Sequence, residues 1–316
     1  METVIIFVFK LDLITMKPFV LFLISFVTLL TNSYVHASPQ PFNPQKIVVA
    51  GGSITEVIYA LGEQQRIVGV DSSSIFPAVA TTQPQIGYVR KISVEGILSL
   101  NPDIILAEAD IGPKKVVEQL KRTAANLVIL HENDSFWRIE NKIEQIASLL
   151  QVQSKGAELA QALKVDRDAL THILEQATTK PKVLVIRSNQ LMVAGADTTV
   201  NELVSIAGGK NVMASSVTNW QTISSEAALV LNPDVIITMS IGVHDQQSNS
   251  ELLNAFKFSN AVKNKRVHNF DVAYLLSMGP RTPQALVELA HAFYPQAQLP
   301  DGYQYRFLKS AANSAK

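Results

Sequence analysis

Short apolar runs alternate with stretches of mixed polarity in the first half of the chain. The stretches have helical character and lie at residues 54–61, 93–100 and 114–122. Strand and helix in this order are typical of a parallel sheet covered by helices, so we expect an α/β lobe over residues 46–135. The apolar runs that predict its buried strands cover residues 46–50 (KIVVA), 67–70, 104–107 and 127–130.

The next segment, residues 136–180, has a different composition. It contains one glycine, Gly156, and no proline, and helix-forming residues dominate it. We predict a helix over residues 139–150 and a long helix over residues 154–177, which could either cover a sheet or join two lobes. We favour a rigid interdomain helix.

A second α/β unit follows over residues 181–316. Strands are expected at residues 182–186 and 235–239, with a hairpin-like piece at 191–194. Helices are expected at residues 199–206 and 283–293. The fold class is therefore α/β, with two Rossmann-like lobes that each contain a parallel sheet.

An internal repeat supports two lobes of similar construction. SVEGILSLNPDIIL (93–106) aligns without gaps with SSEAALVLNPDVII (224–237), and residues 55–62 weakly match residues 201–208. Two similar lobes joined by a helical segment indicate a binding protein whose ligand lies between the lobes.

The N-terminal residues have the character of an export signal. After Met16-Lys17, an apolar run from 18 to 30 leads to VHA at 35–37, which fits cleavage after Ala37. Residues 1–37 are therefore expected to be a cleaved signal peptide, with Met16 as a candidate true start and residues 38–45 as a proline-rich lead. A membrane anchor is the alternative, but Lys10, Asp12 and Lys17 interrupt the apolar residues.

Composition narrows the class of protein further. Lys+Arg and Asp+Glu both number 27, which gives no indication of a nucleic-acid partner. The chain has no cysteine, which excludes disulfides, thiolate metal sites, cysteine nucleophiles and a lipid-modified cysteine. An exported monomer in a Gram-negative periplasm fits these features.

The segment GYVRKISVEGILSLNPD (87–103) carries the strongest candidate chemistry. Tyr88 stands two residues before Arg90, and Lys91 follows. A neighbouring cation lowers the pKa of a tyrosine from about 10, and a phenolate is a ligand suited to haem iron. The alternative is a half-buried aromatic residue beside a solvated arginine.

Other candidates lie where the strands of each sheet end, because ligands of open α/β sheets bind beyond the carboxyl ends of the strands. Ser53 follows the first strand and is expected to cap the next helix. Arg281 opens the last helix, where the helix dipole disfavours a cation, so an anionic ligand would explain it. His244 is the one histidine in a loop expected near the ligand.

Together these segments resemble the periplasmic haem-binding proteins of bacterial ABC importers, in the helical-backbone class (class III) shared with vitamin B12 and ferric siderophore binders. The resemblance covers essentially the whole mature chain. G-Y-x-R is its most specific part, and the other matching segments are AGGSITEVIYALG (50–62), VGVDSSS (68–74), VAGADT (193–198) and MGPRTP (278–283).

The resemblance implies a role for each candidate residue. Tyr88 would ligate the iron of ferric haem, the transported ligand, and Arg90 would hold the phenolate. Lys91 and Arg281 would contact the haem, with Ser53 in the same site. His244 is a candidate ligand of a second haem, as some relatives hold two stacked haems.

The resemblance also implies a partner. In this class a surface glutamate on each lobe docks onto arginines of the inner-membrane permease, which works with a cytoplasmic ATPase. The repeat places these at Glu95 and Glu226. Both glutamates also stand where a carboxylate supports its own helix start.

Three alternatives to a haem receptor remain. A siderophore or cobalamin binder would have the same fold but would not need Tyr88 as a metal ligand. A zinc or manganese receptor needs several converging histidines and carboxylates, and only one histidine is expected near the ligand. An enzyme is disfavoured, because no G-x-S-x-G, G-x-G-x-x-G or P-loop motif is present and no catalytic residue or catalytic cofactor is expected.

Overall fold

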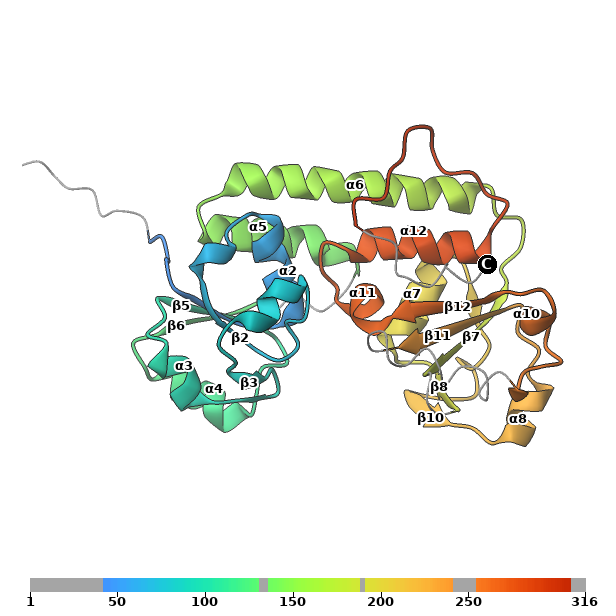
Figure 1. Ribbon diagram of the computed structural model, residues 1–316, viewed down its shortest axis with the longest axis horizontal. Helices are drawn as coiled ribbons and strands as arrows, with labels where there is room; N and C mark the ends of the chain where they lie inside the picture. The colour runs from blue at the N-terminus through green and yellow to red at the C-terminus, as the bar shows by residue number, and fades with distance from the viewer. Residues whose placement is uncertain (1–41, 131–135, 188–190, 241–253, 308–316) are drawn as a thin grey trace, which may run out of the picture. The chain divides into compact units, whose positions relative to one another are not determined.

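The computed structural model describes residues 42–130, 136–187, 191–240 and 254–307 (Figure 1). The expected signal peptide, the first part of the lead and His244 lie outside these ranges. Within them, no helix is both long enough and apolar enough to cross a membrane.

The first lobe contains the four-stranded parallel sheet that the apolar runs predict. Its strands are β1 (Ile47–Ala50), β2 (Ile67–Val70), β5 (Ile104–Glu108) and β6 (Asn126–Leu130), in the order β2-β1-β5-β6. The helices α2 (Gly52–Ala60), α3 (Val94–Ser99) and α4 (Lys114–Lys121) connect them, with 3₁₀ turns at Gln64–Arg66 and Ala78–Thr82. The central strand β1 is buried on both faces, as its unbroken apolar sequence predicts.

Two helices follow the first sheet, as the composition of this segment predicts. A 3₁₀ turn (Phe136–Arg138) leads into α5 (Ile139–Leu149), and α6 (Gln153–Glu175) is the longest helix described. The helix α6 packs against α5 and against α12 (Thr282–Phe293) of the second lobe (Figure 1). One apolar core includes residues of both sheets and of these helices, so α6 joins the two lobes through buried contacts.

The second lobe has a sheet of mixed direction. Strands β7 (Lys182–Arg187), β11 (Val235–Ser240) and β12 (Val267–Asp271) are parallel, and β9 (Lys210–Asn211) pairs parallel with β7. Strands β8 (Met192–Ala194) and β10 (Trp220–Thr222) add an antiparallel edge. Among the described residues of this lobe, the other helices besides α12 are α7 (Thr199–Ile206), α8 (Ser225–Val230), α10 (Asn260–Lys263) and α11 (Val272–Leu276).

The sequence repeat corresponds to repeated local structure. Ser93 caps α3 by accepting a hydrogen bond from the Gly96 amide at 3.0 Å, and Ser224 caps α8 in the same way at 3.2 Å. In the Asn-Pro-Asp turns that follow, each aspartate accepts a backbone N–H from the first strand region of its lobe: Asp103 from Lys46, and Asp234 from Lys182. The two lobes therefore use the same turn to connect a helix with a central strand.

Candidate functional site

Tyr88 lies on a small hairpin and not in an irregular loop. The hairpin pairs β3 (Gly87–Tyr88) with β4 (Lys91–Ile92), and Tyr88 is opposite Lys91. Opposite residues of an antiparallel pair extend from the same face, so the phenol and the ammonium group lie on one side of the hairpin. Tyr88 is 47% exposed, which is unusual for a large aromatic residue of a rigid element.

One buried carboxylate fixes this hairpin to the edge of the sheet. Asp71, which is fully buried at the end of β2, accepts the backbone N–H of Val89 at 3.2 Å. It also accepts the N–H groups of Gly51 and Ser73, both at 2.9 Å, and the Ser74 hydroxyl at 3.0 Å. The loops after β1 and β2 are thereby connected with the turn that carries Tyr88.

The loop after β5 holds the hairpin from its other side. The Gly112 amide donates to the Val89 carbonyl at 2.9 Å, and the Ile92 amide donates to the Gly112 carbonyl at 3.1 Å. The Val89 side chain is buried in an apolar cluster of the first lobe. Backbone bonds on two sides therefore hold the exposed phenol at the carboxyl edge of the first sheet, where ligands of such sheets bind.

Arg90, in the turn of the hairpin, has an acidic partner, Asp110, on the loop after β5. Its Nε donates to Asp110 Oδ2 at 2.8 Å, with the two side chains 66% and 35% exposed. A pair as exposed as this contributes little to stability. Lys91, the next residue, is exposed.

Ser53 does not cap its helix, contrary to the sequence prediction. The residue at the cap of α2 is Gly51, and no side chain accepts a hydrogen bond there. Ser53 is buried; its hydroxyl donates to Glu108 Oε1 at 2.7 Å and accepts from Lys142 Nζ at 2.8 Å. The hydroxyl therefore connects β5 with α5 inside the protein.

Arg281 has an anionic partner within the protein. Its Nε and Nη2 donate to the two carboxylate oxygens of Glu56 at 2.9 and 2.6 Å, and both side chains are at most 7% exposed. Burial raises the pKa of the Glu56 carboxyl, and the Arg281 guanidinium opposes that rise. Glu56 therefore supplies an anion for Arg281 at the start of α12, where the sequence suggested an anionic ligand.

Glu95 and Glu226 are both exposed near the start of their helices. Neither forms a capping box, because each stands two residues after its capping serine and not three. Hydrogen bonds from its own backbone N–H and from the Ser224 hydroxyl lower the pKa of the Glu226 carboxyl. Glu226 is therefore ionised and open to solvent at neutral pH.

Three buried residues that organise this region were not among the predicted site residues: Asp71, Glu56 and Lys142. The position of Asp71 directly after a buried strand was a signal, since such positions lie at the ligand edge of the sheet. Glu56 and Lys142 occur within amphipathic helices, and their sequence surroundings give no indication that their partners lie far away in the chain.

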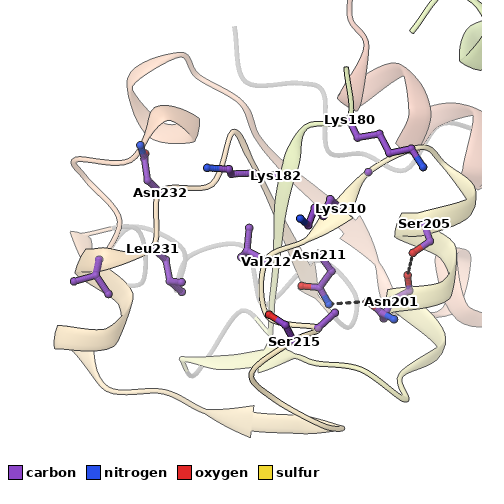
Figure 2. A pocket seen from close by; sticks show the side chains of 13 residues that line it. Lys180, Lys182, Asn201, Ser205, Lys210, Asn211, Val212, Ser215, Leu231 and Asn232 are labelled. Carbon is purple, nitrogen blue, oxygen red and sulfur yellow. Dashed lines mark hydrogen bonds between the residues drawn. The ribbon is translucent and has the colours of Figure 1, made fainter. Parts of the chain in front are cut away.

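A pocket of about 760 Å³ lies in the second lobe, away from Tyr88. Lys180, Lys182 and Lys210 line it, together with residues of α7 and the end of α8. The pocket lies at the amino ends of β7 and β9, opposite to the strand ends where ligands of this fold class bind. Figure 2 shows that the ammonium group of Lys180 points away from those of Lys182 and Lys210, so the three do not form a convergent anion site.

Comparison with known proteins identifies the family. A sequence profile described as "Periplasmic binding protein" matches residues 47–272, which is most of the described chain. The chain belongs to this periplasmic binding protein family.

Relatives and solved structures agree with this assignment. The uncharacterized ABC transporter substrate-binding lipoprotein YvrC of Bacillus subtilis is 31% identical over 261 residues, which cover 80% of this chain and 81% of YvrC. The apo structure of the periplasmic haem-binding protein RhuT from Roseiflexus sp. RS-1 is 32% identical in sequence and superposes with a TM-score of 0.70. The match covers 80% of this chain and 99% of RhuT. A vitamin B12-binding protein of Vibrio parahaemolyticus is 23% identical, with 79% and 89% covered.

The periplasmic binding protein fold accounts for the two lobes and the helix between them. The likeness to RhuT extends over almost its whole length, so it includes both sheets and α6. Among the described residues, no group of three or more histidines, aspartates and glutamates is arranged to hold a metal ion.

Proposed function

We propose that this periplasmic binding protein captures haem between its two lobes and delivers it to an inner-membrane ABC permease. The observation that carries the proposal is the exposed phenol of Tyr88, which the bonds to Asp71 and Gly112 hold at the ligand edge of the first sheet. The similarity to RhuT, a haem-binding protein, supports it. The division into lobes at residues 46–135 and 181–316, joined by residues 136–180, is part of the proposal.

The residues around Tyr88 suit a ferric porphyrin. The phenolate would supply one axial bond to the iron, and the guanidinium of Arg90 would favour the phenolate over the phenol. Lys91, on the same face of the hairpin as Tyr88, would pair with a haem propionate. Ile75 and Val79, which are 45% and 56% exposed on the segment before the hairpin, are apolar residues of the kind that a porphyrin face needs.

Ser53 and Arg281 have a different place in this proposal. Both are buried, with partners within the protein, so they would support the walls of the site and would not touch haem directly. His244, outside the described residues, stays the candidate ligand of a second haem.

The second candidate is a receptor for another chelate, cobalamin or a ferric siderophore. Similarity to the vitamin B12-binding protein of Vibrio parahaemolyticus supports this candidate. In such a receptor Tyr88 would contact the chelate without binding a metal ion, so its replacement would leave the metal spectrum unchanged.

A titration with ferric haemin, followed by absorbance, tests the proposal on purified protein that lacks residues 1–37. We expect a saturable Soret change near one equivalent, with charge-transfer bands typical of tyrosinate ligation. An end point near two equivalents would indicate a second haem and direct attention to His244. Parallel titrations with cyanocobalamin and a ferric siderophore decide between the two candidates.

Tyr88→Phe removes only the phenolic oxygen and is the sharpest variant. It should abolish the charge-transfer bands and weaken haem binding, while the matched variant Tyr59→Phe on α2 should change neither. Unchanged haem affinity and spectrum in Tyr88→Phe would refute the site.

Delivery to a permease is tested separately. We propose that the exposed carboxylates of Glu95 and Glu226 pair with cations of the permease, one from each lobe. The double variant Glu95→Ala/Glu226→Ala should keep the haem affinity of the wild type and lose haem import in cells. Equal import by the double variant would show that docking uses other residues.

A further inference from the structure

A short segment of the second lobe, residues 277–281, lies against the first lobe at several points. Arg281 forms its bidentate ion pair with Glu56 of α2, although the two residues are 225 positions apart. Ser277 donates a hydrogen bond to the same carboxylate. A β-carbon at Gly279 would lie 2.9 Å from Glu56 Oε2, so the backbone passes directly over the carboxylate.

An aromatic ring covers the ion pair. The guanidinium carbon of Arg281 lies 3.6 Å from the centre of the Phe76 ring, on the segment between β2 and the Tyr88 hairpin. The second ring beside Arg281 is that of Tyr274 in α11, at 5.5 Å. Water is therefore excluded from the pair, which strengthens the attraction between its charges and makes either charge unfavourable without the other.

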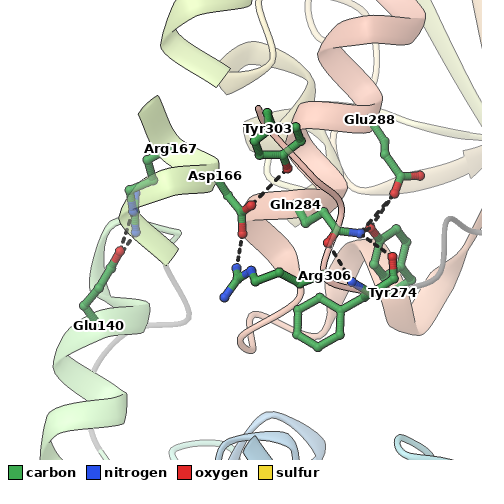
Figure 3. Close-up of polar contacts among 9 residues, drawn as sticks. Glu140, Asp166, Arg167, Tyr274, Gln284, Glu288, Tyr303 and Arg306 are labelled. Atoms are coloured by element: carbon green, nitrogen blue, oxygen red, sulfur yellow. Dashed lines mark hydrogen bonds and ion pairs between the residues drawn. The ribbon is translucent and has the colours of Figure 1, made fainter. Parts of the chain in front are cut away.

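The segment that follows α12 supports Phe76. In this C-terminal strap, residues 300–307, the Phe307 ring packs edge-on against Phe76 at 6.5 Å. Its backbone N–H donates to Gln284 of α12 at 2.9 Å. Tyr303 and Arg306 of the strap both bind Asp166 of α6 (Figure 3). The strap is thus attached to both long helices of the lobe junction before it reaches Phe76.

The ion pair is also connected with the hairpin of Tyr88. Glu56 belongs to α2, whose cap residue Gly51 donates its N–H to Asp71. Asp71 in turn accepts the N–H of Val89, next to Tyr88. Arg281 of the second lobe is therefore connected with the turn that presents the phenol through Glu56, the backbone of α2 and the buried hydrogen bonds of Asp71.

We propose that Glu56, Arg281 and Phe76 form a latch that fixes the second lobe against the first and thereby sets the spacing across the ligand site. Arg281 is then a positioning residue and not a ligand contact. The effect on haem rests on the proposed function, whereas the effect on lobe spacing does not.

The absence of cysteine from the sequence makes the lobe spacing directly measurable. Gln119 in α4 and Ser216 in the second lobe are both exposed, so each can be replaced by cysteine and spin-labelled. Pulsed electron paramagnetic resonance on the double variant Gln119→Cys/Ser216→Cys then measures one distance between the lobes. Glu56→Gln removes the negative charge of the latch and keeps the shape of the side chain. The matched control is Glu63→Gln, since Glu63 is also a buried carboxylate but is paired with Arg66 and Lys155 instead of with Arg281.

We expect a single narrow distance distribution in the parent protein and in Glu63→Gln. In Glu56→Gln the distribution should become at least about twice as wide or shift by several ångströms, because the uncompensated Arg281 leaves its buried position. Phe76→Leu, which keeps both charges but exposes them to water, should give a smaller change in the same direction. It also serves as the test if Glu56→Gln does not fold.

The proposal would be overturned if Glu56→Gln and Phe76→Leu both fold and both show the distance distribution of the parent protein.

Haem release is a separate measurement. Glu56→Gln should release haem roughly tenfold faster than the parent protein and keep the tyrosinate bands, because the iron ligand is intact. If the parent protein binds no haem, the proposed function fails, and the distances still decide whether the latch exists.

Discussion

Asp71→Asn changes one oxygen of the carboxylate that holds the Tyr88 hairpin to an amide nitrogen. Asp71 is fully buried, and each oxygen accepts two hydrogen bonds: Oδ1 from Gly51 and Ser74, and Oδ2 from Ser73 and Val89. An amide has the same shape, so the substitution tests hydrogen bonding and charge without creating a cavity.

The magnitude follows from the better of the two amide orientations. With Nδ2 towards Gly51 and Ser74, the Ser74 hydroxyl can turn to accept a bond, but the Gly51 N–H is left without an acceptor. A buried unpaired N–H costs about 2 kcal/mol, and the two bonds that remain lose about 1 kcal/mol each when the acceptor is no longer charged. We therefore expect a loss of about 4 kcal/mol, a large part of the stability of an ordinary domain.

Urea unfolding at pH 7, followed by circular dichroism, measures this loss. The matched control is Asp110→Asn, which neutralises an exposed carboxylate on the neighbouring loop and should change the free energy of unfolding by less than about 1 kcal/mol. The folded Asp71→Asn protein should also bind haem more weakly, because a neutral amide oxygen holds the Val89 N–H, and with it the hairpin, less strongly than the carboxylate does. A loss below about 1 kcal/mol for Asp71→Asn would refute the reasoning, since the four bonds would then carry no net energy.

Two further predictions concern the hairpin and the second sheet. Gly87 has φ of 103°, and a β-carbon there would lie 2.6 Å from the Lys91 carbonyl oxygen. Gly87→Ala should therefore lower the free energy of unfolding by about 2 kcal/mol or more and weaken haem binding. In the control Gly302→Ala, at φ of 76° with open space around the new β-carbon, both effects should be smaller. Burial and then the nearby Arg266 lower the pKa of His268 below 6.5. As the pH falls, the imidazole is therefore protonated in the unfolded chain before it is protonated in the folded protein, so stability decreases as the pH drops below 6.5. In His268→Gln the melting temperature should decrease less between pH 7 and pH 5 than in the wild type. An equal decrease in both proteins would contradict this.

Elements with a strong local signal could be predicted from the sequence. The runs that became β1, β5, β7 and β11 are mostly apolar and end within one residue of the predicted limits. Strand β12 was missed because His268 and Asn269 interrupt its apolar pattern. It forms because β11 offers it a parallel edge, which is a property of the assembled sheet.

The candidate site divides in the same way. The motif around Tyr88, the caps Ser93 and Ser224, and the repeat of the two lobes depend on neighbours within a few residues, so the sequence alone determined them. The partners of Ser53 and Arg281 are 55 and 225 positions away, and only the tertiary structure decided that these side chains are buried. Long-range electrostatic pairing requires that the chain first brings its charges together out of water, and no local pattern of residues records that event.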